Sequence, residues 1–149
     1  MKIISSYIIN NDEIDFILGT VKKENKIYSG YRPSEIKLRF NIIPSAAAGF
    51  FVKLSSLKKV GLYNTKYKIS SDYDMLYRLI EKYKMKGIRT KPKEILGDLG
   101  TSGFSSKHNF LKSLLAELKI RLDNKQNIFI LLYIFFGRCC MKIFQLLKN

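Results

Sequence analysis

The chain has 149 residues, enough for one domain with a core, and its hydrophobic content of 46% excludes a disordered protein. Its 27 basic and 12 acidic residues give a formal net charge of +15, which indicates nucleic acid, an anionic membrane surface or a phosphate-bearing substrate as partner. Because the basic residues are scattered, with neither zinc-finger spacing nor a basic-region heptad pattern, nucleic acid ranks last and we expect none.

The first 40 residues predict short elements separated by turns. Residues 1–11 are compatible with a helix or a strand, and two serines break their apolar stretch, so we expect no signal peptide. Residues 15–21 form an apolar run typical of a buried strand, and residues 26–31 alternate as an outer strand does. Pro33 suits the first turn of a short helix that continues to about Phe40.

Residues 42–52 are the most apolar part of the first half of the chain. Pro44 and the small residues after it predict a loop that leads into a strand at residues 50–52. Small side chains allow a ligand or another backbone to approach closely, and tight packing is the simpler interpretation. Either Ser55 or Ser56 can then cap a short helix that ends at Val60.

Residues 70–87 contain the clearest helical pattern of the chain. Ser71 and Asp74 form an S-x-x-D capping signature at its start, and Gly87 is a suitable stop. Apolar residues then recur at the spacing of one helical face. We therefore predict an amphipathic helix over this range.

Two carboxylates lie in the first turn of this helix. Asp72 and Asp74 are placed where the positive end of the helix dipole favours negative charge. Asp74 and Arg78 are four residues apart and can form an ion pair. Two interpretations remain open, since the aspartates either only cap and solvate the helix or carry chemistry in a cleft.

The remaining chain changes character at about residue 108. Residues 88–96 predict an extended segment interrupted by Pro92, and residues 97–106 form a loop rich in Gly and Ser that can offer backbone amides to an anion. We expect a first unit over residues 1–108 and C-terminal amphipathic and apolar helices over residues 109–149.

The C-terminal segment combines leucines, aromatic residues and scattered basic residues. Residues 110–122 predict an amphipathic helix with its leucines on one side and Arg121 elsewhere, and residues 123–126 break it. The apolar run 128–137 has ten residues, whereas a span of the hydrocarbon core needs about 20. We expect an interfacial membrane helix here, with a core or dimer helix as the alternative. The adjacent Cys139 and Cys140 exclude a disulfide framework and fit a reducing compartment.

The order of these motifs resembles the second half of a family 2 glycosyltransferase of the GT-A fold, of the bacterial type that builds surface polysaccharides. The resemblance covers roughly residues 10–106 and rests on DFILGTV, GYRP, IIPSAAAGFFVK, LKKVGLYNTKYKISSDYDMLYRLI and DLGTSGFSS. It implies an α/β fold: a partial GT-A-like mixed sheet flanked by helices, with a C-terminal helical extension.

The resemblance also implies roles for individual residues. Asp72 matches the aspartate that serves as general base of an inverting transfer, the expected catalytic residue. The segment around residues 47–51 matches the region that faces the acceptor. The expected substrate-binding residues are Ala47, Ala48, Gly49, Phe50, Ser71, Asp74 and Arg78.

The nucleotide-binding half of such an enzyme ends in a DXD motif whose carboxylates hold a divalent metal, Mg or Mn. Residues 1–15 contain no such motif, so we expect the metal ligands to lie outside this chain and the chain to be inactive without a nucleotide-binding half. It is then either a truncated product or a piece that works with a separate nucleotide-binding half in trans. The implied partners are a nucleotide-sugar donor and a glycan or lipid-linked acceptor. The implied location is the cytoplasm, peripheral at the inner face of the cell membrane.

Three hypotheses follow from the sequence. The first is an acceptor-side half of a glycosyltransferase, and it predicts an exposed apolar sheet edge where the missing half would dock. The second is a non-catalytic, basic membrane-surface protein on a degraded glycosyltransferase fold, in which Asp72 is only a helix cap. The third is a nucleic-acid binder, whose affinity would fall steeply with salt.

Overall fold

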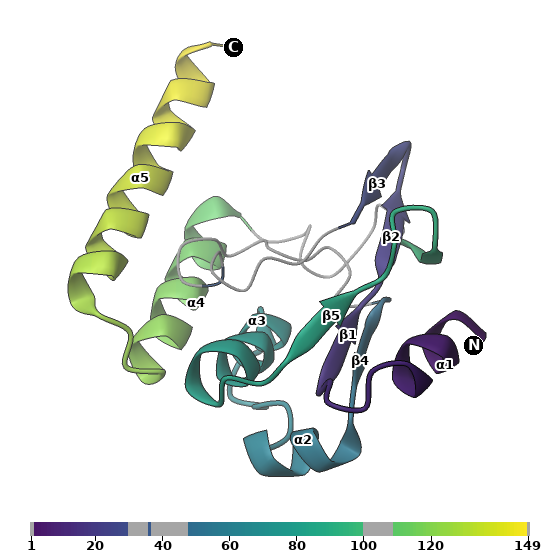
Figure 1. The fold of residues 1–149 in the computed structure, drawn as a ribbon. Coiled ribbons are helices and arrows are strands. Elements are labelled where there is room, and N and C mark those ends of the chain that lie inside the picture. Colours follow the sequence, from purple (N-terminus) through teal and green to yellow (C-terminus); the bar gives the residue numbers. More distant parts are fainter. Residues whose placement is uncertain (1, 30–35, 37–47, 100–108, 149) are drawn as a thin grey trace.

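The computed structural model describes residues 2–29, 36, 48–99 and 109–148. Within these residues the protein is α/β, with two small mixed sheets and five α-helices (Figure 1). The predicted helix from Pro33 to Phe40 and the glycine-rich loop beyond Leu99 lie outside the described residues.

The first sheet has the strand order β4-β1-β5. Its central strand β1 (Phe16–Leu18) pairs antiparallel with β4 (Phe50–Val52) and parallel with β5 (Gly87–Arg89). The predicted strand at residues 50–52 is therefore confirmed. All three residues of β1 are buried, as the apolar run predicted.

The second sheet has the order β3-β2-β6 and continues the direction of the first. Its strand β2 (Thr20–Lys23) pairs antiparallel with β3 (Lys26–Tyr28) and parallel with β6 (Ile95–Leu99). The single strand predicted over residues 15–21 is thus wrong in one respect, because the chain passes from one sheet to the other at Gly19.

Gly19 allows this crossing by its lack of a side chain. A Cβ atom there would lie 2.2 Å from Cδ1 of Leu96, and the Gly19 N–H donates to the Gly49 carbonyl at 2.7 Å. A Cβ on Gly49 would in turn lie 3.1 Å from the Gly19 carbonyl oxygen. Gly49, directly before β4, therefore serves close backbone packing at this junction.

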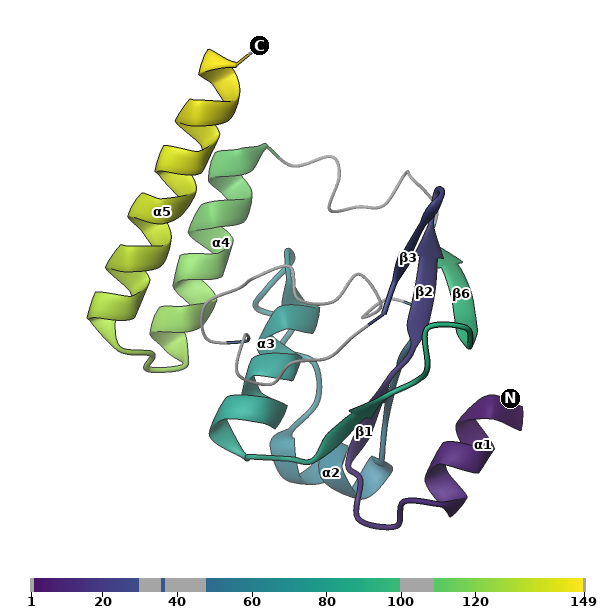
Figure 2. The ribbon, with the colours of Figure 1, turned by 45° about the horizontal axis from the view of Figure 1, so that its top comes forward.

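The ambiguous N-terminal segment is a helix, α1 (Lys2–Ile9), on the side of the strands opposite to the other helices (Figures 1 and 2). The Tyr7 hydroxyl donates to Oε2 of Glu94 at 2.6 Å and accepts from the Lys91 N–H at 3.1 Å. This side-chain link joins α1 to the turn before β6.

Helix α2 (Leu54–Val60) begins two residues earlier than a cap at Ser55 would place it. Its N-cap residue is Lys53, so the prediction that Ser55 or Ser56 caps this helix is wrong. The Ser56 hydroxyl instead donates to Oδ1 of Asp15 at 2.6 Å, while Oδ2 of Asp15 accepts from the Lys86 N–H at 2.8 Å. The serine thus joins α2 to the entrances of β1 and β5.

The central helix is shorter than predicted and changes type along its length. It runs as α3 (Ser71–Tyr77) and continues as a π-helix, η3 (Arg78–Lys82). Ser71 is the first helical residue and not the cap, because Ser70 precedes the helix in the left-handed region at φ 64°. Gly87 does not stop the helix and belongs to β5.

Helix α3 lies between the strands and the C-terminal helices in both views (Figures 1 and 2). One cluster of buried residues joins its inner face to β1 and to α4 (Phe110–Asp123), including Phe16, Met75, Leu79 and Ile120. The predicted apolar face of α3 is confirmed by this cluster. Helix α3 is therefore held by core contacts on the side of β1 and on the side of α4.

Helix α4 has the predicted range and a side-chain cap from Asn109, which accepts from the Lys112 N–H at 2.9 Å. Its predicted leucine face is wrong, because Leu111, Leu115 and Leu122 are exposed. The buried side is made by Leu114, Glu117, Ile120 and Arg121. Paired charges thus occupy the inward positions that the leucine pattern assigned to apolar residues.

Helix α5 (Ile128–Leu147) continues well beyond the apolar run of the sequence, to 20 residues. By length and composition it could cross a membrane, with a mean hydropathy of 1.7 over its most apolar stretch, of which 11% is buried. The helix thus reaches the length of a span, which the ten-residue apolar run alone does not. The helix lies alongside α4 and projects past it (Figure 2).

The position of Gly87 supports a stability prediction with an internal control. A Cβ atom there would lie 2.2 Å from the ring of Phe16, which is buried in the core, so Gly87→Ala should lower the free energy of unfolding by about 1–3 kcal/mol. A Cβ on Gly137 in α5 meets nothing within 4 Å, so Gly137→Ala should be neutral or raise stability by up to about 1 kcal/mol. Urea unfolding of both variants tests this, and equal midpoints would contradict it.

Candidate functional site

Asp72 is the exposed carboxylate in the first turn of α3. Its Oδ1 accepts from the Tyr73 N–H at 2.9 Å, which orients the side chain from within its own turn. Neighbouring residues of the helix face the core, and Tyr73 donates its hydroxyl to the Ile36 carbonyl at 3.0 Å. The structure therefore presents one accessible carboxylate from a helix whose other side is fixed.

Tyr63, in the loop before α3, adds a second functional group near Asp72. Burial raises the pKa of the Tyr63 hydroxyl, and the negative charge of Asp72 raises it further. The ring remains 44% exposed, so the phenol is a neutral donor that solvent or a ligand can reach. The sequence held no signal for this residue beyond its place in a polar loop.

Asp74 faces the opposite way from Asp72 and is 2% exposed. Its Oδ2 accepts from Nε of Arg78 at 2.9 Å, which confirms the predicted pair. Its Oδ1 accepts from Nδ2 of Asn124 at 2.8 Å, at the end of α4. Both oxygens of this carboxylate therefore have protein partners.

Arg78 uses its remaining donors on backbone carbonyls around Gly61. Nη1 donates to the Val60 carbonyl at 2.8 Å and Nη2 to the Leu62 carbonyl at 2.9 Å. The guanidinium thus fixes the loop that carries Tyr63 against the helix that carries Asp72. Asp74 and Arg78 were predicted as substrate-binding residues, and their contacts here are with the protein.

The other predicted substrate-binding residues lie in two places. Ser71 is half-buried in the first turn of α3, next to Asp72. Ala48, Gly49 and Phe50 lie at the junction of the two sheets, where Phe50 packs edge to face with Phe16 at 6.1 Å between ring centroids. Ala47 lies outside the described residues. The structure thus places Ser71 beside Asp72 in the first turn of α3 and leaves the junction residues as a separate group.

The C-terminal end of α4 attaches to the site helix and its loop through polar contacts. The Asp123 carboxylate accepts from the Tyr67 hydroxyl at 2.7 Å and from Nζ of Lys66 at 2.9 Å. The hydrogen bond from Tyr67 lowers the pKa of Asp123, and burial raises that of Tyr67. Arg121 lies over the Tyr73 ring at 5.1 Å. Residues 123–126, predicted only as a helix break, therefore also brace the site.

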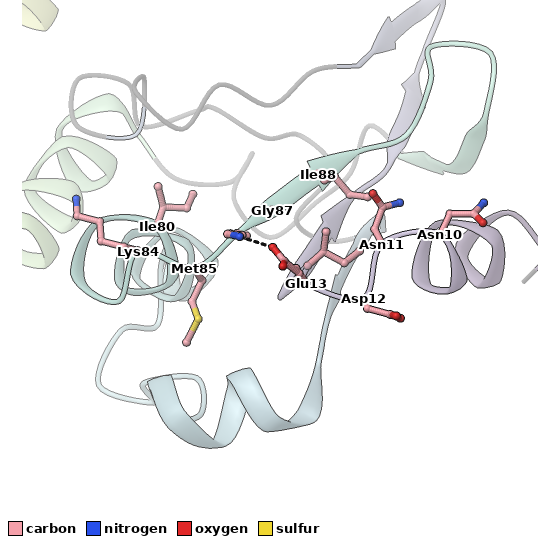
Figure 3. Close-up of a pocket in the computed structure, with 11 residues that line it drawn as sticks. Asn10, Asn11, Asp12, Glu13, Ile80, Lys84, Met85, Gly87 and Ile88 are labelled. Atoms are coloured by element: carbon pink, nitrogen blue, oxygen red, sulfur yellow. Dashed lines mark hydrogen bonds and ion pairs between the residues drawn. The ribbon is translucent and has the colours of Figure 1, made fainter.

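An open depression of about 740 Å³ lies elsewhere, between the entrance to β1 and the link from η3 to β5 (Figure 3). Its rim carries Glu13, whose carboxylate accepts from Nζ of Lys86 at 2.5 Å. This hydrogen bond lowers the pKa of Glu13. Asp72 does not line the depression, which is therefore separate from the candidate site around Asp72.

No group of three or more His, Cys, Asp or Glu side chains among the described residues is arranged to hold a metal ion.

No family model, curated protein or solved structure matches this chain. A function can therefore be inferred only from the sequence motifs and from the arrangement of residues around Asp72.

Proposed function

We propose that this chain is the acceptor-side half of an inverting, family 2-like glycosyltransferase with a partial GT-A-like sheet. The observation that carries the proposal is the exposed Asp72 carboxylate at the start of a helix braced on both sides. The order of motifs from DFILGTV to GTSGFSS assigns the same residue as base by resemblance.

In the proposed reaction Asp72 removes the proton from an acceptor hydroxyl. The hydroxyl oxygen then forms a bond to the anomeric carbon of the donor sugar, and the bond from that carbon to the nucleotide diphosphate breaks with inversion. The proton remains on the Asp72 carboxyl and the electron pair leaves with the diphosphate. A general base positioned in this way contributes typically about 10²–10⁴ in rate.

Tyr63 and Ser71 would orient the acceptor. The neutral Tyr63 phenol can donate a hydrogen bond to a sugar oxygen beside Asp72, because burial and the Asp72 charge both favour its protonated form. Arg78 would act indirectly, since it fixes the Tyr63 loop through the Val60 and Leu62 carbonyls. The acceptor is a glycan or a lipid-linked sugar in this proposal.

Strand β4 offers a place for a nucleotide-binding half to dock. The Gly19 N–H donates to the Gly49 carbonyl, and the Lys53 N–H donates to the Asp15 carbonyl. Because hydrogen-bonded and non-hydrogen-bonded pairs alternate along an antiparallel ladder, the peptide groups of Phe50 and Val52 point away from β1. No described strand pairs with that edge, and the Phe51 side chain is 42% exposed. An open edge with an apolar residue is what the half-enzyme hypothesis requires.

The partner half would supply the nucleotide-sugar site and the carboxylates for a divalent metal, Mg or Mn, which would neutralise the diphosphate when bound. Association with the inner face of the cell membrane belongs to the same proposal, because lipid-linked acceptors are embedded there and the chain carries a net charge of +15.

The test is sugar transfer by the full chain complemented with a nucleotide-binding half of a family 2 enzyme. Asp72→Asn keeps the size and the hydrogen bond to Tyr73 but is not a base, so transfer should fall by about 10²–10⁴. Asp12→Asn is the matched control, because Asp12 is an exposed carboxylate outside the site. Unchanged transfer by Asp72→Asn would rule out the assigned base, and transfer lost equally in both variants would point to charge alone.

A further inference from the structure

Helix α5 carries a continuous apolar face that the protein does not cover. The face consists of residues that follow one another at helical spacing: Phe129, Leu132, Tyr133, Phe136, Cys140, Ile143, Phe144 and Leu147. At about 100° per residue they form a stripe roughly 120° wide that contains no charged side chain. Tyr133 is 71% exposed and Leu147 is 79% exposed, so the stripe is open along the whole helix.

The charged residues of α5 lie on the opposite side. Arg138 and Lys142 are both half-buried and point toward the α4 side of the helix, and Arg138 donates to Oε2 of Glu117 in α4. Lys148 follows at the C-terminal cap. Helix α5 is therefore amphipathic, with Arg138 and Lys142 opposite the stripe, while Nζ of Lys148 at the C-terminal cap lies 4.6 Å from the centroid of the Phe144 ring, beside the stripe.

We infer that this stripe binds the surface of an anionic lipid bilayer with α5 lying in the plane of the membrane. Such a helix buries its apolar face at the boundary between headgroups and acyl chains and keeps its basic residues at headgroup level. The inference deepens the membrane location named above and rests on the proposed function for that setting alone.

The attachment to α4 favours the in-plane orientation over a span. Helix α5 is about 30 Å long, which would suffice to cross the hydrocarbon core. A span would place Arg138 near its middle together with the Glu117 carboxylate that it contacts on α4. Helix α4 also carries Lys112, Lys119, Arg121 and Asp123, so the pair of helices cannot enter the hydrocarbon together.

Charge favours lipid over a second copy of the chain as the occupant. Residues 128–148 contain three cations and no acidic residue, and the chain as a whole has a net charge of +15. Two copies of a chain with this net charge repel each other, whereas an anionic membrane surface attracts it.

Membrane binding through α5 would also fix the height of the site. Arg138 ties α5 to α4, and Asn124 at the end of α4 donates to Asp74 in α3. Asp72 is two residues from Asp74 in the same short helix, so its distance from the bilayer would be set by these polar contacts. A fixed distance suits an acceptor that is itself anchored in the membrane.

The test uses the full chain and vesicles of phosphatidylcholine with or without phosphatidylglycerol. Co-sedimentation with the anionic vesicles is expected, and Phe136→Glu or Phe129→Glu should weaken it about tenfold or more each. Both side chains are exposed, so circular dichroism should show an unchanged fold. Leu62→Glu is the matched control, because Leu62 is an apolar residue outside α5 that is about as exposed as Phe129 and Phe136. This variant should bind the anionic vesicles as the parent chain does.

Depth is measured on Cys140, which lies in the stripe, after Cys139→Ser leaves it as the single thiol. A fluorophore on Cys140 should be quenched more by lipids with a spin label near the headgroup than by lipids labelled near the chain end. Quenching strongest at the chain ends would overturn the in-plane orientation. Failure to bind either vesicle, or dimerisation in solution that Phe136→Glu abolishes, would overturn the lipid as occupant. Vesicle binding by a preparation without sugar transfer supports this inference and counts only against the proposed function.

Discussion

Glu117→Ala is expected to lower the free energy of unfolding by about 3–5 kcal/mol, among the largest effects of any single substitution in this chain. Glu117 is fully buried in α4 and accepts from Nη2 of Arg121 at 2.7 Å and from Nε at 2.9 Å. It also accepts from Arg138 of α5. Alanine would leave the buried Arg121 guanidinium without its anion and would separate α5 from α4.

Burying the Glu117–Arg121 ion pair carries a desolvation cost, yet breaking the pair destabilises the protein, and a double variant can show both effects. Burial raises the pKa of the Glu117 carboxyl even though the charges of Arg121 and Arg138 lower it, so the desolvation is not fully offset. Replacing both partners by apolar residues, in Glu117→Leu with Arg121→Met, should therefore recover most of the loss. Arg121 also bonds Gln126 and lies over Tyr73, so the recovery should be incomplete.

The measurement is urea unfolding of the single and double variants in a thermodynamic cycle. Glu13→Ala is the control, because Glu13 pairs with Lys86 at an exposed site, where such pairs contribute little. A double variant as unstable as Glu117→Ala would contradict the assignment of the loss to an uncompensated charge.

The local pattern of the chain predicted most elements correctly. The apolar run before Gly19, the residues 50–52 and the amphipathic face of α3 are where the sequence places them, because each contributes side chains of one kind at regular spacing to one core. The pair Asp74–Arg78 was predictable for the same reason, since four residues make one turn.

Features that depend on distant residues were not predictable. Gly87 looks like a helix stop, but its absent Cβ makes room for the ring of Phe16, which is 71 residues earlier. Ser56 looks like a cap, but Asp15 takes its hydroxyl. The leucines of α4 are exposed because Glu117 and Arg121 take the inward positions, where each satisfies the charge of the other.

The candidate site likewise combines local features, which the sequence predicts, with contacts between distant residues, which it does not. The first-turn carboxylates Asp72 and Asp74 could be named from the local pattern, and the resemblance in motif order then singled out Asp72 as the expected base. Tyr63 and Asn124 could not be predicted in this way. Tyr63, whose pKa the charge of Asp72 raises, belongs to another loop, and Asn124 donates to Asp74 across 50 residues.

Asp74 and Asp72 should separate stability from activity, although they lie two residues apart. Asp74→Ala removes the acceptor for Nε of Arg78 and for Nδ2 of Asn124 at a buried position, and should cost about 2–3 kcal/mol. Arg78 keeps its bonds to the Val60 and Leu62 carbonyls, so the loss should stay below that of Glu117→Ala. Asp72→Ala loses one exposed local hydrogen bond and should cost less than about 1 kcal/mol.

The two variants are compared by thermal unfolding and by transfer in the complemented system. Asp72→Ala should abolish transfer with little change in the unfolding midpoint, while Asp74→Ala should lower the midpoint and retain transfer at temperatures where it is folded. Asn124→Ala provides a third comparison, because it leaves both carboxylates in place and removes the hydrogen bond from α4 to Asp74 together with the bond to the Ile120 carbonyl within α4. If Asp74→Ala proves stable but inactive, Asp74 contacts the acceptor, and the base must be sought at both positions of the turn.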